Sequence, residues 1–272
     1  MGRRDAELAE GDTAVREAAR SLEPDRYLAA LLSPRPARAG LIALAAFLGE
    51  VGRIPAMVSE PAMGEIRLQW WREALTAAPS GAATGSPVAD AMRQTMRQHA
   101  LPELAVLSLI DAYSPSLVPG SLAAPGAVDA YADATQRAAF RLAAQILGVP
   151  DGAAAEHYLA AAAQSCGRVQ LLRSLPALVK RGRNPLGEDA AADWAAAVQP
   201  LLAEARAWLE EARQRASAAP ATIRPALLPL ALVEPYLAAL ERLGPNVAGQ
   251  RAEISPLTRV WRLYKASALA RV

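Results

Sequence analysis

The chain of 272 residues has little of what many catalytic and metal sites are built from, with 1 cysteine, 2 histidines and 2 phenylalanines. A single cysteine excludes an internal disulfide. His99 and His157 lie far apart in the sequence, which excludes the usual zinc sites of histidine and cysteine. Cys166 lies among Ala and Ser, and we interpret it as a small buried residue and not as a nucleophile.

Long apolar runs are also scarce. The most apolar stretches are 40–48, which is too short to cross a bilayer, and 225–240, which Pro229, Glu234 and Pro235 interrupt. The N-terminal residues mix acidic and basic side chains and no apolar core follows them, which predicts neither a signal peptide nor a transit peptide. We therefore expect a cytoplasmic protein, and peripheral contact with the inner membrane stays open.

The residues that are abundant favour helices. The chain is 53% hydrophobic, and alanine is its commonest residue, whereas β-branched residues are sparse. This composition predicts helices and no strands. The net charge of +2, with no basic stripe interleaved with aromatics, argues against nucleic acid as a partner.

Prolines and glycines divide the sequence into about ten predicted helices. Their expected ranges are 13–33, 36–58, 61–78, 86–100, 102–113, 125–148, 151–180, 188–217, 221–243 and 255–270. The loops 79–86, 115–125 and 182–187 are too short to separate domains. We expect one all-α domain over 24–272, preceded by residues 1–23 as an N-terminal extension that includes the start of the first helix.

The segment 60–75, EPAMGEIRLQWWREAL, places a charge on an apolar helix face. Met63, Ile66 and Trp70 share an arc with Trp71, and Arg67 falls within it. A guanidinium stays charged and is costly to bury without a partner. We therefore expect Arg67 to be buried against a carboxylate of the fold or against an anion in a cavity.

Common catalytic signatures are missing, but the spacing DxxxD occurs twice, at Asp129 with Asp133 and at Asp189 with Asp193. Carboxylates four residues apart share a helix face and can chelate Mg²⁺ bound to diphosphate. Acidic residues are also favoured in the first turns of helices, where both pairs are predicted to lie. Both interpretations stay open from the residues alone.

The run from Arg38 to Leu75, RAGLIALAAFLGEVGRIPAMVSEPAMGEIRLQWWREAL, resembles the squalene/phytoene synthase family. Further landmarks follow in the same order: Tyr131 with Thr135, Gly167, Leu-Leu-Arg at 171–173 and Pro-Tyr-Leu at 235–237. The resemblance implies a single-domain isoprenoid-synthase bundle with a central cavity.

The chain departs from that family where active members hold Mg²⁺ and diphosphate on two aspartate-rich helical motifs. The matching positions are Gly52 and Ala56 for the first motif, and Ser174 and Leu178 for the second. At the second motif, Gln170 shares one helical stripe with Ala163, Gly167 and Ser174. We expect Pro176 to interrupt the helix just beyond this stripe. Arg173 belongs to the family-like Leu-Leu-Arg. None of the four motif positions carries a carboxylate, so no metal cofactor is expected there.

The chain lacks both aspartate-rich motifs and keeps Glu50 in a family-like FxxE sequence. In this combination it resembles a branch of the superfamily that includes an assembly factor for respiratory complex I. That resemblance implies a non-catalytic role, with partners among complex I subunits or assembly intermediates, or with an isoprenoid or lipid ligand. Glu50 is the expected carboxylate partner of Arg67.

Three hypotheses therefore compete: a non-catalytic partner-binding or lipid-binding protein, a divergent Mg²⁺-dependent prenyl transferase that uses the DxxxD pairs, and a helical scaffold without a ligand. Two basic clusters bear on the choice. One consists of Lys180, Arg181 and Arg183, and the other of Arg137 and Arg141. Each cluster suits either a phosphate or acidic partner, or a solvated surface.

Overall fold

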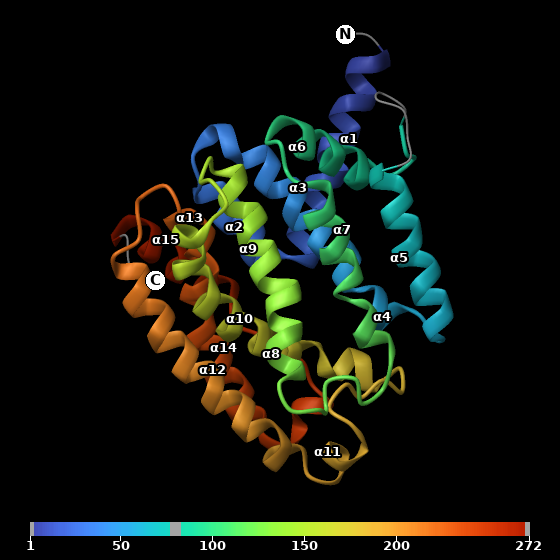
Figure 1. Cartoon of the computed structure of the whole chain (residues 1–272), viewed down its shortest axis with the longest axis vertical. Helices are drawn as coiled ribbons and strands as arrows, with labels where there is room; N and C mark the ends of the chain where they lie inside the picture. Colours follow the sequence, from blue (N-terminus) through green and yellow to red (C-terminus); the bar gives the residue numbers. More distant parts are fainter. Residues whose placement is uncertain (1–2, 77–82, 270–272) are drawn as a thin grey trace.

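The computed structural model describes residues 3–76 and 83–269, and these residues form helices and no strand (Figure 1). In chain order the elements are α1 (Arg3–Leu22), α2 (Pro24–Leu32), α3 (Arg35–Gly52), α4 (Ile54–Met57), α5 (Pro61–Thr76), α6 (Pro87–Gln98), α7 (Glu103–Asp111), the 3-10 helix η1 (Ser114–Leu117), α8 (Ala127–Ala132), the π-helical turn η2 (Asp133–Arg137), α9 (Ala138–Ile146), α10 (Ala153–Val179), α11 (Glu188–Ala192), α12 (Trp194–Ser217), α13 (Arg224–Leu227), the 3-10 helix η3 (Leu228–Leu232), α14 (Val233–Leu243), the 3-10 helix η4 (Gly244–Ala248) and α15 (Pro256–Leu269).

The all-α prediction is confirmed, and every predicted helical range contains helix. Several ranges are divided where the backbone requires it. Pro24 begins α2 after a break at Glu23, and a turn at Arg53 separates α3 from α4, in which Pro55 lies near the N-terminus. The expected helix ends at 77–78 and 270, and loop residues 79–82, lie outside the described residues. The division of the chain at residue 24 stays a prediction, and α1 packs against α3 and α6.

The long helix α10 is central to the bundle. It packs against α12, α14 and η2, and it carries fully buried side chains such as Leu159 and Leu172. The expected break at Pro176 is wrong, because the helix continues to Val179 and the carbonyl of Pro176 accepts the N–H of Lys180.

Burial raises the pKa of the Cys166 thiol to about 12, which keeps this half-buried residue protonated at neutral pH.

No helix within residues 3–76 and 83–269 is long and apolar enough to cross a membrane.

The core joins helices that are distant in the sequence. Phe47 of α3, which is fully buried, contacts the ring of Trp71 on α5 edge-on at 5.4 Å between centroids. Through this contact α5 lies against the bundle at one edge of the molecule (Figure 1).

Candidate functional site: the central pocket

A pocket of about 410 Å³ lies between α3, α4 and α10, and we call it the central pocket. Its size lies in the range typical of small-molecule sites. Its walls come from both halves of the chain: Ser21, Leu22, Glu23, Leu48, Gly49, Gly52, Arg53, Pro55, Ala56, Tyr113, Ser116, Tyr131, Gln136, Gly167, Gln170, Leu171, Arg173, Ser174, Pro176, Ala177, Leu178, Lys180, Gly249 and Arg251.

The four positions that correspond to the family's metal motifs line this pocket together. Gly52 and Ala56 approach it from α3 and α4, and Ser174 and Leu178 from α10. The first pair is not on one continuous helix, because α3 ends at Gly52 and Ala56 lies on α4. The structure therefore brings the expected positions together with no carboxylate on any of them.

Glu23 is the one carboxylate among the described residues that line the central pocket. Burial raises the pKa of the Glu23 carboxyl, and the positive charge of Arg26 partly opposes this effect. A Mg²⁺ cluster that binds diphosphate needs several charged oxygen ligands. Within the described part of the chain no group of three His, Cys, Asp or Glu side chains could hold a metal ion. The lining residues thus do not fit a magnesium site.

Basic side chains surround the same pocket. Arg173 is buried in its wall, and Arg53, Lys180 and Arg251 lie at exposed positions. Arg53 donates to Glu50 at 2.6 Å, and Arg251 pairs with Glu253 at 3.1 Å between Nε and Oε1. Arg173 is likewise paired, with Asp25. Lys180 makes no ion pair within the described residues, and it favours an anionic or polar group that is bound directly and not through a metal.

Two tyrosines complete the wall on the side of η1 and α8. The rings of Tyr113 and Tyr131 meet edge-on at 6.5 Å between centroids. Burial raises the pKa of both phenols, so each stays neutral and is able to donate a hydrogen bond. Tyr113 faces Gly52, where a Cβ atom would lie 3.4 Å from the phenol ring.

Beside the pocket, Arg173 belongs to a buried ionic network centred on Asp25 of α2. Asp25 accepts hydrogen bonds from Arg259 Nε at 2.6 Å and from the Tyr236 hydroxyl at 2.9 Å, and its Oδ2 is 3.5 Å from an Arg173 nitrogen. The Arg173 guanidinium also stacks on the Tyr236 ring, 3.8 Å from its centroid. Burial, followed by the negative charge of Asp25, raises the pKa of Tyr236 to about 12, which keeps its proton on the donor oxygen.

Sequence reasoning missed the role of Asp25. Arg173 and Tyr236 lie in the family-like Leu-Leu-Arg and Pro-Tyr-Leu sequences, and the structure shows that they contact each other. Asp25 follows Pro24 in the first turn of a helix, where an acidic residue is ordinary. Its spacing from Arg173 and Arg259 carries no local signal, so only the fold reveals the network.

The expectation that Arg67 is buried and paired with Glu50 is wrong. Arg67 is exposed, and Glu50 binds Arg53 of its own helix end. The buried stripe of α5 consists of Gly64, Leu68, Trp71 and Leu75, at the helical spacing of i, i+4, i+7 and i+11. The apolar side chains Met63, Ile66 and Trp70 face solvent with exposed fractions of 48%, 61% and 41%.

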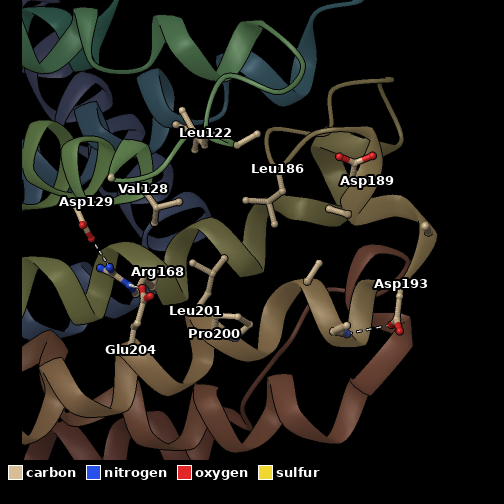
Figure 2. Close-up of a pocket in the computed structure, with 17 residues that line it drawn as sticks. Leu122, Val128, Asp129, Arg168, Leu186, Asp189, Asp193, Pro200, Leu201 and Glu204 are labelled. Carbon is tan, nitrogen blue, oxygen red and sulfur yellow. Dashed lines mark hydrogen bonds and ion pairs between the residues drawn. The ribbon is translucent and has the colours of Figure 1, made fainter.

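Three of the four alternative metal residues, Asp129, Asp189 and Asp193, line a second pocket of about 580 Å³ between α8, α11 and α12 (Figure 2). Asp129 binds the guanidinium of Arg168, which is 3% exposed and also contacts Glu204 at 2.8 Å. Asp193 caps α12 by accepting the N–H of Ala196 at 3.0 Å. In Figure 2 Asp189 and Asp193 lie well apart from the Asp129 side.

The fourth alternative residue, Asp133, is held by protein side chains. It accepts a hydrogen bond from Gln164 Nε2 at 2.7 Å and pairs with Arg137. Among the described residues the four aspartates therefore form no common cluster. Asp129 and Asp133 are neutralised by Arg168 and Arg137, which opposes metal binding.

The two basic clusters serve mainly internal contacts. Arg183 is buried and donates to the Pro55 carbonyl, and Arg181 Nε donates to the Ala56 carbonyl at 3.3 Å. These bonds join the loop after α10 to α4 at the pocket wall. Arg137 and Arg141 both pair with Glu156. Lys180 is exposed and lines the central pocket.

The chain belongs to the squalene/phytoene synthase family, because the sequence model described as "Squalene/phytoene synthase" matches residues 19–258. The protein "NADH dehydrogenase (ubiquinone) complex I, assembly factor 6" of Rattus norvegicus is 26% identical over 243 residues, which are 84% of this chain and 73% of that protein. The Bos taurus protein of the same name is 29% identical over 160 residues, which are 59% of this chain and 48% of that protein.

Solved structures agree on the fold. The squalene synthase HpnC from Alicyclobacillus acidocaldarius matches with a TM-score of 0.66 and 19% identity, over 88% of this chain and 96% of that one. A dehydrosqualene synthase in complex with ligand matches with a TM-score of 0.68 and 12% identity, over 97% and 98% of the two chains. The predicted isoprenoid-synthase-like fold is thereby confirmed.

Proposed function

We propose that this protein is a non-catalytic member of its family that assists the assembly of respiratory complex I, at the cytoplasmic side of the inner membrane. The observation that carries the proposal is the central pocket, where Gly52, Ala56, Ser174 and Leu178 replace both carboxylate motifs. The similarity to complex I assembly factor 6 over 73% of the length of the rat protein supports it independently. Its partners are then complex I subunits or assembly intermediates.

The central pocket suits a ligand with an apolar body and a polar or anionic end, such as an isoprenoid or another lipid. Leu48 and Leu171 supply apolar wall, and Lys180 supplies positive charge. Ionisation of a prenyl diphosphate requires that the charge of the leaving group be neutralised as it forms. Glu23 alone does not supply the several charged oxygen ligands that such a Mg²⁺ cluster needs, so the pocket binds such a molecule without activating it.

We expect the purified protein to form no squalene, dehydrosqualene or phytoene from farnesyl or geranylgeranyl diphosphate in the presence of Mg²⁺. The reason is that neither Gly52 with Ala56 nor Ser174 with Leu178 provides a metal ligand. Mass spectrometry of extracted products checks this, with an active dehydrosqualene synthase as the positive control. The proposal would be contradicted if product formed and this formation stopped when Mg²⁺ was chelated.

Deleting the gene in its host should lower the amount of assembled complex I and leave carotenoid, hopanoid and squalene levels unchanged. Native gel electrophoresis of solubilised membranes measures the complex, and lipid extraction measures the isoprenoids. Complementation with the wild-type gene is the control. Loss of hopanoid or carotenoid with normal complex I would favour the prenyl transferase function over a role in complex I assembly.

A divergent Mg²⁺-dependent prenyl transferase is the second candidate. Its supporting observation is the second pocket, whose lining includes Asp129, Asp189 and Asp193. Changing Asp129 or Asp189 to Asn distinguishes the two functions, because only a transferase that uses these residues would lose product formation.

A further inference from the structure

The outer face of the C-terminal helix α15 is apolar and open to solvent. Leu257, Val260, Trp261 and Tyr264 are exposed by 78%, 50%, 59% and 55%. Their spacing places them on one stripe of the helix. The opposite face holds α15 to the bundle through the buried side chains of Leu263 and Ala266 and packs on η3 and α2.

This stripe is presented on a fixed helix. Arg259 is bound by Asp25, at 2.6 Å between Nε and Oδ1, and by the Tyr236 hydroxyl at 3.1 Å, so the ionic network beside the central pocket also fixes α15. The rings of Trp261 and Tyr264 stack, with 6.4 Å between centroids and 30° between planes. The exposed aromatic pair therefore belongs to an ordered surface.

The charged side chains of α15 itself have one sign, although the exposed Glu253 before the helix lies 3.6 Å from Arg259. After Glu253 the sequence contains no Asp or Glu, whereas Arg259, Arg262, Lys265 and Arg271 follow. Arg262 and Lys265 are exposed and make no ion pair within the described part of the chain. Stacked Trp and Tyr side chains with flanking cations suit the interface of a bilayer, where amphipathic rings lie at headgroup level and Lys or Arg meets anionic lipid.

A second exposed apolar stripe makes a useful contrast. On α5, at the opposite edge of the molecule (Figure 1), Met63, Ile66 and Trp70 are exposed. Glu65 and Glu73 lie on the same helix, so its charges are mixed and an anionic surface would be repelled as well as attracted. Charge complementarity to an anionic bilayer is thus a property of α15 and not of α5.

We propose that α15 docks the protein on an anionic lipid bilayer, lying in the membrane interface with Leu257, Val260, Trp261 and Tyr264 facing the acyl boundary. Arg262 and Lys265 contact the phosphate headgroups. The inference names the surface behind the peripheral location in the proposed function, and rests on that function only for the choice of membrane. Vesicle binding by the purified protein is measured apart from complex I assembly, so each can fail alone.

The experiment is co-sedimentation of the full-length protein with vesicles of phosphatidylcholine, alone or with about 30 mol% phosphatidylglycerol. We expect binding to the anionic vesicles and at least tenfold less to the neutral ones. Trp261→Ser should weaken binding about tenfold or more, because it removes the largest inserted side chain. The double variant Arg262→Gln, Lys265→Gln should remove most of the preference for anionic lipid.

The matched control is Trp70→Ser, which removes an exposed tryptophan from the α5 stripe and should leave vesicle binding unchanged; Trp70 is 41% exposed and Trp261 59%. Circular dichroism and thermal unfolding establish that each variant is folded. The proposal is overturned if the wild type does not bind anionic vesicles, or if folded Trp261→Ser binds as well as the wild type. It is also overturned if Trp261→Ser instead converts a dimer to a monomer, which would make α15 an interface between two copies of the chain.

Discussion

Replacing Asp25 with alanine should lower the free energy of unfolding by roughly 3–5 kcal/mol. The change leaves the guanidiniums of Arg173 and Arg259, whose side chains are 6% and 11% exposed, without their shared carboxylate. It also removes the acceptor of the Tyr236 hydroxyl. Glu253, at 3.9 Å from Arg173 and 3.6 Å from Arg259, is half-exposed and compensates little. Urea unfolding followed by circular dichroism measures the loss.

The matched control is Arg206→Ala. Arg206 also joins two carboxylates, Glu234 and Glu241, but its side chain is 42% exposed. Removing an exposed ion pair costs about 1 kcal/mol or less, because water screens the charges and replaces the contacts. Equal losses for Asp25→Ala and Arg206→Ala would show that the Asp25 network contributes no more than a surface pair.

The Asp25 network marks the limit of what the sequence reveals. Helices were predictable because alanine-rich composition, prolines at first turns and glycines in loops are local signals. Asp25, by contrast, meets Arg173, Tyr236 and Arg259 from three other helices far along the chain. A pairing of that kind depends on how helices are arranged in three dimensions, and no local spacing encodes it.

The candidate site was predictable where family order supplied the alignment and not where helix phase had to be judged alone. Family order identifies Gly52, Ala56, Ser174 and Leu178 as the positions of the two motifs, and all four line the central pocket. The predicted phase of α5 is wrong because its apolar residues span a wide arc. Part of that arc, with Leu68 and Trp71, faces the core, whereas Met63, Ile66 and Trp70 face solvent beside Arg67. Amphipathic patterning does not tell which part of a wide arc is covered.

Replacing Gly167 of α10 with alanine should cause the second large loss of stability. A Cβ atom at Gly167 would lie 2.5 Å from the Cβ and 3.0 Å from the Cα of Ala132, so α8 and α10 would have to separate. We expect Gly167→Ala to lower the free energy of unfolding by about 1–3 kcal/mol, although alanine is favoured over glycine within a helix by about 1 kcal/mol. Thermal and urea unfolding both measure the change.

Gly52 is the matched control because it lines the same pocket. A Cβ atom there would meet the Tyr113 ring at 3.4 Å, which is an ordinary contact, so Gly52→Ala should be neutral or slightly stabilising. Adding Ala132→Gly to Gly167→Ala should restore part of the lost stability, since it removes the closer of the two clashing atoms. A Gly167→Ala protein as stable as the wild type would mean that α8 moves away freely. In that case the close approach of α8 to α10 does not fix Tyr131 at the wall of the central pocket.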